Sequence, residues 1–444
     1  MTKKVAPDLT QLLAAVGLTD QQITLMAFST GAWKRARKIR PADVLKHLCE
    51  ESIVGTVSYN DLAAAVAAHT GVDASRQAYA QHLNPAVIAL LKALLETAME
   101  ANIMAAEEVL VVRGKLLEFR RILIQDSTVI QLPASLFGIY SGVKNAHVAV
   151  CNARIQVIYD LRSGRFIDFR IDPYSRNDFA AASDLKPEPG DLILRDRGYF
   201  VIEVVEKQTK AEAASINRYM NTIPLYDPET KKQLDLVDLL SREGTVDMVV
   251  LVGSAKTFRC RLVAAPISEE AANLRRMKAK RENKSPPSDQ LLKLMSWTIM
   301  LTTLFDPTVS FGDILRLYGL RWRIENIFKT WKSNFSFAKI HRVSDCQFKC
   351  LIFARLLVVT LLFRVVFTPM SHLFRTKGGK DLSLMKLMRY ATRHLGQVAR
   401  LGGRMPKAEA INALSRYCTY EKRKRPNFMS LVDFSDVGAE CTNP

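Results

Sequence analysis

Residues 318–332, with the sequence YGLRWRIENIFKTWK, place one carboxylate among several cations. At about 100° per residue on an α-helix, five polar side chains of this stretch fall within an arc of roughly 80°. They are Tyr318, Arg321, Glu325, Lys329 and Lys332. The adjoining arc is apolar and could pack into a core, while the polar arc borders a cleft. A carboxylate in this setting could hold a metal ion beside bound phosphates. A solvated helix face with weak ion pairs would show the same pattern.

Two further carboxylates lie at predicted strands. Asp126 lies in the strand-like run KLLEFRRILIQDSTVIQLP, and Asp196 directly follows the short apolar run DLILR. A carboxylate buried in a strand is costly unless it binds a cation. Together with Glu325, these acids could hold two Mg²⁺ ions, or Mn²⁺ in their place, for phosphoryl transfer. One ion would activate the attacking water or 3′-hydroxyl, and the other would stabilise the leaving oxygen.

Four other aspartates compete with this set of acids: Asp160, Asp168, Asp172 and Asp178. Asp160 precedes the turn-prone Ser163-Gly164 pair and is more simply explained by that turn. The other three are explained by solvation. We therefore keep Asp126, Asp196 and Glu325 as the candidate metal ligands.

The elements that must position these acids predict an α/β fold. Residues 152–171 predict a hairpin, which is followed by a helix over NDFAAASDL and the strand DLILR. Three antiparallel strands, a helix and another strand match the opening order of the ribonuclease H-like fold. The strand-like runs DMVVLVGS and TFRCRLVAA and the charged stretch RRMKAKRENKSPPSDQ then interrupt the pattern, which indicates a β-rich insertion.

The N-terminal part reads as a small helical domain. It contains the helical runs YNDLAAAVAAHTG and SRQAYAQHLNPAVIALLKALLETAME, and Ser75 is a plausible N-cap for the second. Arg76, Gln77 and Gln81 could face a DNA groove, although ordinary solvated residues would look the same. The predicted division is a helical DNA-binding domain at 1–108, a core in two parts at 109–210 and 301–375, the insertion at 211–300, and a helical C-terminal region for DNA contacts or dimerisation at 376–444.

The overall charge favours a polyanionic partner. The chain has 63 Lys plus Arg residues against 44 acidic residues, a formal net charge of +19. Nucleic acid is the first candidate and an anionic membrane the second. The most apolar segment, residues 351–367, contains Arg355 and Arg364, so we predict a buried core helix and no membrane span. Seven scattered cysteines and the lack of a secretory signal pattern favour a reducing cytoplasm.

The spacing of Tyr318, Arg321, Glu325 and Lys332 resembles the YREK signature of the fourth insertion-sequence family of DDE transposases. The resemblance extends to DST at Asp126, DRGY at Asp196 and WTIMLT at Trp297. It implies that Asp126, Asp196 and Glu325 form the metal-binding triad. It also implies that Tyr318, Arg321, Lys329 and Lys332 hold phosphates at the transposon end, and that Trp297 stacks on a flipped base.

The resemblance thus implies a prokaryotic enzyme that nicks double-stranded DNA at the terminal inverted repeats and joins 3′-hydroxyls to target DNA. A hairpin intermediate could release the flanking DNA, and the paired ends imply a homodimer. Two alternatives remain open at this point. A ribonuclease H-like nuclease would use the same triad with water as the sole nucleophile, and a catalytically idle derivative would need only the basic surface.

Overall fold

The structure, a computed structural model, describes residues 9–35, 38–101, 116, 118–142, 150–282, 285–402 and 408–421. These residues form helices and a sheet that has both parallel and antiparallel strand pairs, which confirms the predicted α/β fold class. The chain forms two compact units. Unit 1 takes its residues from 9–101, 127–176 and 323–421, and unit 2 from 116–126 and 177–322.

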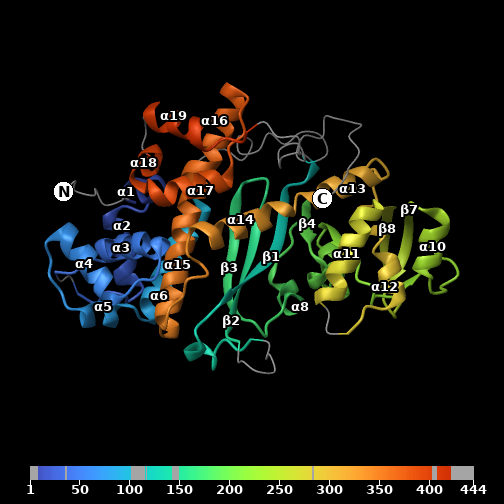
Figure 1. The fold of residues 1–444 in the computed structure, drawn as a ribbon, viewed down its shortest axis with the longest axis horizontal. Helices are drawn as coiled ribbons and strands as arrows, with labels where there is room; N and C mark the ends of the chain where they lie inside the picture. The colour runs from blue at the N-terminus through green and yellow to red at the C-terminus, as the bar shows by residue number, and fades with distance from the viewer. Residues whose placement is uncertain are drawn as a thin grey trace. The chain divides into compact units, whose positions relative to one another are not determined.

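Unit 1 is largely helical (Figure 1). Its N-terminal helices are α1 (Thr10–Ala15), α2 (Asp20–Ser29), α3 (Pro41–Val54), α4 (Tyr59–Thr70), α5 (Arg76–His82) and α6 (Pro85–Glu100). Its C-terminal helices are α14 (Trp322–Asn334, of which Trp322 belongs to unit 2), α15 (Asp345–Leu361), α16 (Thr368–Gly378), α17 (Leu384–Arg393), α18 (Leu395–Ala399) and α19 (Ala408–Tyr417). A π-helical turn, Leu362–Phe367, joins α15 to α16. The basic run YEKRKRPN lies almost entirely outside the described residues.

The predicted helix from Ser75 to residue 100 is two helices. Ser75 caps α5 as predicted, because its side chain accepts a hydrogen bond from the Ala78 amide. The helix then ends at His82, and Asn84 caps α6 through Oδ1, which accepts from the amides of the next two non-proline residues. Pro85 is the reason for the break, because a proline disfavours helical backbone in the residue before it and suits the first turn of a new helix.

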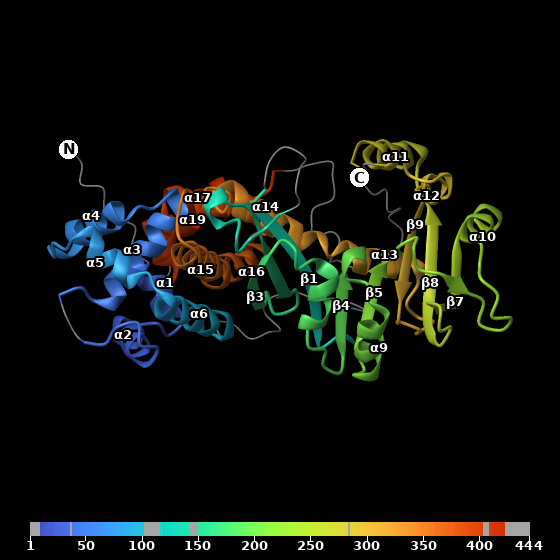
Figure 2. The same cartoon turned by 90° about the horizontal axis from the view of Figure 1, so that it is seen from below.

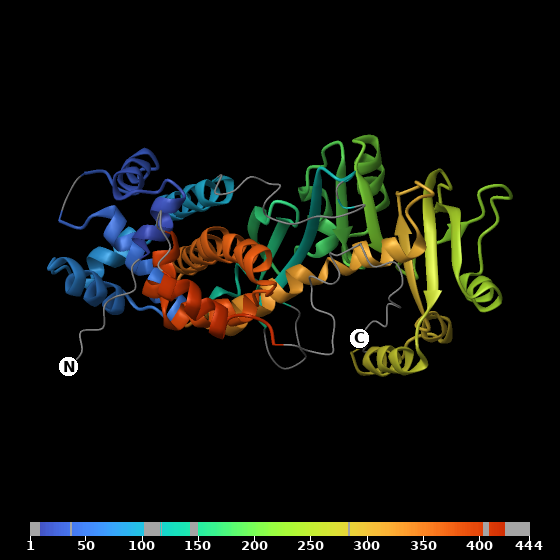
Figure 3. The ribbon, with the colours of Figure 1, turned by 90° about the horizontal axis from the view of Figure 1, so that it is seen from above.

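Helix α15 is the centre of unit 1. It packs against α3 and α6, so segments from the two ends of the sequence lie side by side, as the blue and orange ribbons show in Figure 3. The continuous helical stretch Asp345–Thr376 is long and apolar enough to cross a membrane, but its most apolar window is entirely buried within the structure. This confirms the predicted core helix. Arg355 is buried there and donates to the carbonyls of Ser52 and Gly55, which offsets part of the cost of burying its charge.

The strands of unit 1 form the predicted hairpin. β2 (Asn152–Asp160) pairs antiparallel with β3 (Arg165–Pro173), and β2 neighbours β1 (Arg121–Gln131) on its other side. Gly164 adopts a φ of 63° in the connecting turn, a conformation that glycine reaches without strain. The Asp160 carboxylate accepts from the Arg162 and Ser163 amides, which confirms its predicted role in the turn.

Unit 2 is built on a sheet that begins with the N-terminal part of β1. The strand order is β1, β4 (Asp191–Arg195), β5 (Ala214–Arg218), β9 (Trp297–Thr302), β8 (Phe258–Pro266), β7 (Val246–Val252) and β6 (Leu225–Tyr226). Strands β1, β4 and β5 are mutually parallel, and every later pairing is antiparallel. The carboxyl ends of β1, β4 and β5 therefore meet at one edge, where side chains can converge on a ligand.

Among the residues of unit 2 that the structure describes, the α-helices beside this sheet are α8 (Asp178–Ala181), α9 (Ile202–Lys210), α10 (Leu236–Glu243), α11 (Glu269–Glu282), α12 (Asp289–Leu294) and α13 (Phe311–Gly319). The charged helix α11 starts earlier than its basic run suggested, because two glutamates occupy its first turn. Helices α11 and α12 lie past the end of β8, as Figure 2 shows. Arg275 of α11 donates to the carbonyl of Trp297 at 3.1 Å, which ties this helix to the start of β9.

Candidate active site

One register row of unit 2 brings two of the predicted acids together. Gln125 of β1 is paired with Arg195 of β4. One residue further along these parallel strands, Asp126 and Asp196 occupy neighbouring positions. Side chains in register on adjacent strands project from the same face, about 4.8 Å apart. Asp196 keeps extended backbone angles (φ −77°, ψ 164°) where the strand gives way to a turn, so its side chain is held at the edge.

The predicted continuous helix over residues 318–332 is interrupted. Helix α13 ends at Gly319, and α14 begins at Trp322. The intervening amides bond three residues back, Leu320 to the carbonyl of Leu317 and Arg321 to that of Tyr318. Glycine is a poor helix former, and these shorter bonds tighten the turn, so the single polar arc expected from ideal geometry was wrong. The apolar side chains of both helices are nonetheless buried as predicted.

The tightened turn directs two signature residues toward the two aspartates. The Tyr318 hydroxyl lies 3.4 Å from Oδ1 of Asp196, and Nη1 of Arg321 lies 2.9 Å from Oδ2 of Asp126. The Arg321 guanidinium also lies over the Tyr318 ring, 5.6 Å from its centroid. Burial, together with the Asp196 charge, raises the pKa of Tyr318 to about 12, so at neutral pH it is a neutral hydrogen-bond donor.

The other signature residues belong to unit 1. Glu325 lies in the first turn of α14 and is half-buried, whereas Lys329 and Lys332 are exposed on the same helix. On an unbroken helix, residues at these spacings share one face. Helix α14 therefore presents one carboxylate and two ammonium groups together, as the sequence predicted for this half of the stretch.

The donor chemistry of these acids suits a hard divalent cation. Carboxylate oxygens are the ligands that Mg²⁺ prefers. Asp126 and Asp196 lie at adjacent register positions, and Asp126 already attracts a cation in the form of the Arg321 guanidinium. Among the described residues, no three His, Cys, Asp or Glu side chains gather closely enough to enclose a metal. The residues fit the ion by type and, for the two aspartates, by position.

Trp297 begins β9 and is partly buried. It packs against the apolar core of unit 2, and its indole N–H donates to the carbonyl of Gly244 at 3.1 Å. Its hydrogen-bonding group is thus satisfied within the protein. Base stacking, which uses the ring face, remains a prediction for this residue.

Two of the aspartates that compete for the metal-binding role form ion pairs with arginines. Asp168 pairs with Arg170, and Asp172 pairs with Arg176.

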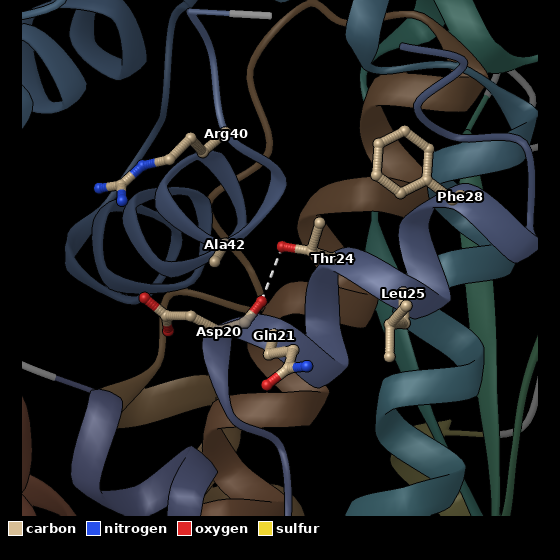
Figure 4. Close-up of a pocket in the computed structure, with 7 residues that line it drawn as sticks. All are labelled: Asp20, Gln21, Thr24, Leu25, Phe28, Arg40 and Ala42. Atoms are coloured by element: carbon tan, nitrogen blue, oxygen red, sulfur yellow. Dashed lines mark hydrogen bonds between the residues drawn. The ribbon is translucent and has the colours of Figure 1, made fainter. Parts of the chain in front are cut away.

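A pocket of about 280 Å³ lies elsewhere in unit 1, at α2 and the start of α3 (Figure 4). It is lined by Asp20, Gln21, Thr24, Leu25, Phe28, Arg40 and Ala42. Its one acid, Asp20, pairs with Lys46 at 3.2 Å, so this pocket lacks the paired carboxylates that metal-assisted phosphoryl transfer requires.

Comparison with known proteins identifies the family. The family model described as "Transposase DDE domain" matches residues 117–361, more than half of the chain, and this range contains Asp126, Asp196, Glu325 and the other signature residues. The chain is a DDE transposase. Transposases of this family are enzymes that cleave DNA and transfer its strands with the help of metal ions. The match decides against the nuclease without strand transfer.

Similar transposases are known from bacteria. This DDE transposase is 28% identical over 352 residues to the transposase for insertion sequence element IS231E of Bacillus thuringiensis subsp. finitimus, covering 73% of this chain and 72% of that one. It is 26% identical over 292 residues to the transposase for IS1151 of Clostridium perfringens, covering 60% and 61%. These relatives confirm the predicted membership of the fourth insertion-sequence family.

A solved piggyBac transposase synaptic complex with hairpin DNA aligns with 96% of this transposase and 88% of that chain, at 10% identity and a TM-score of 0.47. A likeness at this level defines neither the fold nor the partners.

The sequence patterns did not single out Arg197 and Arg218 of unit 2, which lie beside Asp196 in sequence and in strand register. Arg197 stands within the DRGY motif, which was a usable signal. Arg218 ends β5 next to the position of Asp196, and only the strand register places it there.

Proposed function

We propose that this DDE transposase moves an insertion sequence by cut-and-paste transposition, with Asp126, Asp196 and Glu325 as the ligands of two Mg²⁺ ions. The single observation that carries the proposal is the register of β1 and β4, because it sets Asp126 and Asp196 side by side at the carboxyl edge of parallel strands. The strand order β3-β2-β1 in unit 1 and β1-β4-β5 in unit 2 supports a ribonuclease H-like core. The division into helical terminal domains and a β-rich insertion is part of the same proposal.

In this mechanism the three carboxylates hold the metal ions, and the signature cations hold the substrate. When bound, the ions activate the water or 3′-hydroxyl nucleophile and stabilise the leaving oxygen. Arg321 grips a phosphate next to the scissile bond, since its planar guanidinium matches phosphate oxygens in pairs. Tyr318 stays neutral, and its hydroxyl group donates a hydrogen bond. Lys329 and Lys332 hold the strand from the exposed face of α14, and Trp297 stacks on a flipped base, which would favour a hairpin intermediate.

The substrate we propose is double-stranded DNA: the terminal inverted repeats of the element and then the target. Exposed Arg76, Gln77 and Gln81 on α5 support a role of the N-terminal helices in reading the ends. Two ends must be held together for concerted insertion, which implies a homodimer. The similar bacterial transposases support a cytoplasmic location.

Metal removal tests this function directly. A duplex carrying the element's own end should be nicked at that end in Mg²⁺ or Mn²⁺, and the nicked 3′-end should join to a target plasmid. EDTA should abolish both products, and added Mg²⁺ should restore them, because the carboxylates alone cannot activate the nucleophile. Mapping the products on sequencing gels measures both steps. Cleavage that persists in EDTA, or nicking that never yields joined products, would contradict the proposal.

A further inference from the structure

One face of α17, in the C-terminal part of unit 1, carries both basic and aromatic side chains. Lys386, Arg389, Tyr390 and Arg393 are spaced by three or four residues, so they share one side of this helix. The opposite side is apolar and buried. Arg389 and Arg393 are exposed, and Tyr390 is half-buried. The packed side anchors the helix, and the basic side is available to a ligand.

Three rings of this region form an aromatic row: His394, Tyr390 and Tyr417. The centroids of Tyr390 and His394 are 4.5 Å apart, and those of Tyr390 and Tyr417 are 6.2 Å apart with the ring planes within 14° of parallel. Tyr417 is the last residue of α19, which packs against α17. Its side chain is 56% exposed, and the Arg416 guanidinium lies 5.6 Å from its ring centroid. The aromatic row thus includes a large ring that is open to solvent beside a cation.

The arginines around the aromatic row are not neutralised by the chain. In the part of the chain that the structure describes, Arg389, Arg393 and Arg416 form no ion pair with a carboxylate. Glu409 lies in the first turn of α19, about two turns before Arg416. The other two acids of residues 381–421 are engaged by other cations: Asp381 pairs with Arg375, and Glu421 pairs with Lys386. The positive charge of this surface therefore favours an anionic partner.

We propose that Arg389, Arg393, Arg416 and Tyr417 form a binding site for single-stranded DNA, in which a base stacks on the Tyr417 ring and the arginines hold backbone phosphates. Aromatic rings within a basic surface are the usual means of binding unpaired bases, because every base has a face that can stack. In a duplex those faces are already covered by neighbouring base pairs. The proposal rests on the function proposed above, since strand transfer is the step that supplies unpaired DNA to this enzyme.

The test measures how the full-length protein binds a fluorescent oligothymidine of about 20 nucleotides, in EDTA and over a range of salt concentrations. Tyr417→Ala should weaken binding about tenfold and leave the slope of log affinity against log salt unchanged. Tyr417→Phe keeps the ring, so it should bind as the wild type does. Arg389→Gln should weaken binding and reduce the slope by about 0.7, because one phosphate contact is lost. Arg242→Gln, at an exposed position of α10, removes the same charge elsewhere and should leave the slope unchanged.

Wild-type affinity of Tyr417→Ala would overturn this site, as would an equal loss in Tyr417→Phe or an equal loss of binding to duplex DNA of the same length. If Tyr417→Ala unfolds, as judged by circular dichroism, the exposed Arg389 and Arg393 variants decide the result. Cleavage and joining of the element's own end by the wild type in Mg²⁺, without binding of the oligothymidine, would show that only this site had failed. A wild-type protein that binds neither DNA and cleaves nothing would overturn the site together with the proposed function.

Discussion

Glu325→Gln is expected to slow cleavage of the transposon end by on the order of a thousandfold, because a metal ligand supports several kcal/mol of transition-state stabilisation. Glutamine keeps the shape of the side chain and removes the charge. Glu325 is half-buried in the first turn of α14, and its apolar neighbours on that helix are buried, so the fold should tolerate this change. The rate is measured as nicking of an end-labelled duplex in saturating Mg²⁺.

Binding separates this effect from misfolding. The Glu325→Gln protein should still shift the same duplex in a gel, since Lys329 and Lys332 remain on the helix. Glu203→Gln is the matched control, because Glu203 is an exposed glutamate in the first turn of α9. It should cleave at the wild-type rate. Equal cleavage by Glu325→Gln and the wild type would remove Glu325 from the set of ligands.

Arg321→Gln is expected to lower the cleavage rate about a hundredfold, comparable to the loss of one preorganised donor to a developing charge. Arg321 is 8% exposed and lies 2.9 Å from Asp126, so it contributes to the placement of that carboxylate as well as to phosphate binding. Arg321→Lys should recover only part of the rate, because an ammonium group lacks the planar pair of donors.

The measured quantities are the single-turnover cleavage rate and the Mg²⁺ concentration that gives half of it. Loss of a phosphate contact lowers the rate, and loss of the neighbour of Asp126 shifts the Mg²⁺ dependence. Arg242→Gln controls for the change in net charge. A rate within twofold of wild type for Arg321→Gln would contradict both roles.

Local sequence signals predicted much of the secondary structure. The hairpin β2–β3 was predicted from its alternating residues and the Ser163-Gly164 turn, and Ser75 was identified as an N-cap because its hydroxyl can accept an amide hydrogen bond. The break before Pro85 was missed although the Asn-Pro pair signals it. The break at Leu320 and Arg321 was missed because an ideal helical arc runs through Gly319 without interruption.

Local sequence patterns could not predict the contacts between segments that are far apart in the sequence. Asp126 and Asp196 could be suspected from their types and from the family resemblance, but their adjacency depends on how β1 and β4 align. The register of β4 and β5 sets Arg218 level with Asp196, and a hydrogen bond from another element brings Arg275 to Trp297. Pairing between strands and helices far apart in sequence is fixed by the packed fold, so the sequence suggested the acids by their types and gave no sign of which residues lie level with them.

Asp196→Cys, assayed for cleavage in Mg²⁺ and in Mn²⁺, tests most directly whether the acids of this transposase hold its metal ions. A thiolate is a poor ligand for Mg²⁺ and a better one for the softer Mn²⁺. We predict loss of cleavage in Mg²⁺ and substantial recovery in Mn²⁺. Asp238→Cys, at an exposed position of α10, should match the wild type in both metals. Full activity of Asp196→Cys in Mg²⁺ would contradict the metal-binding role.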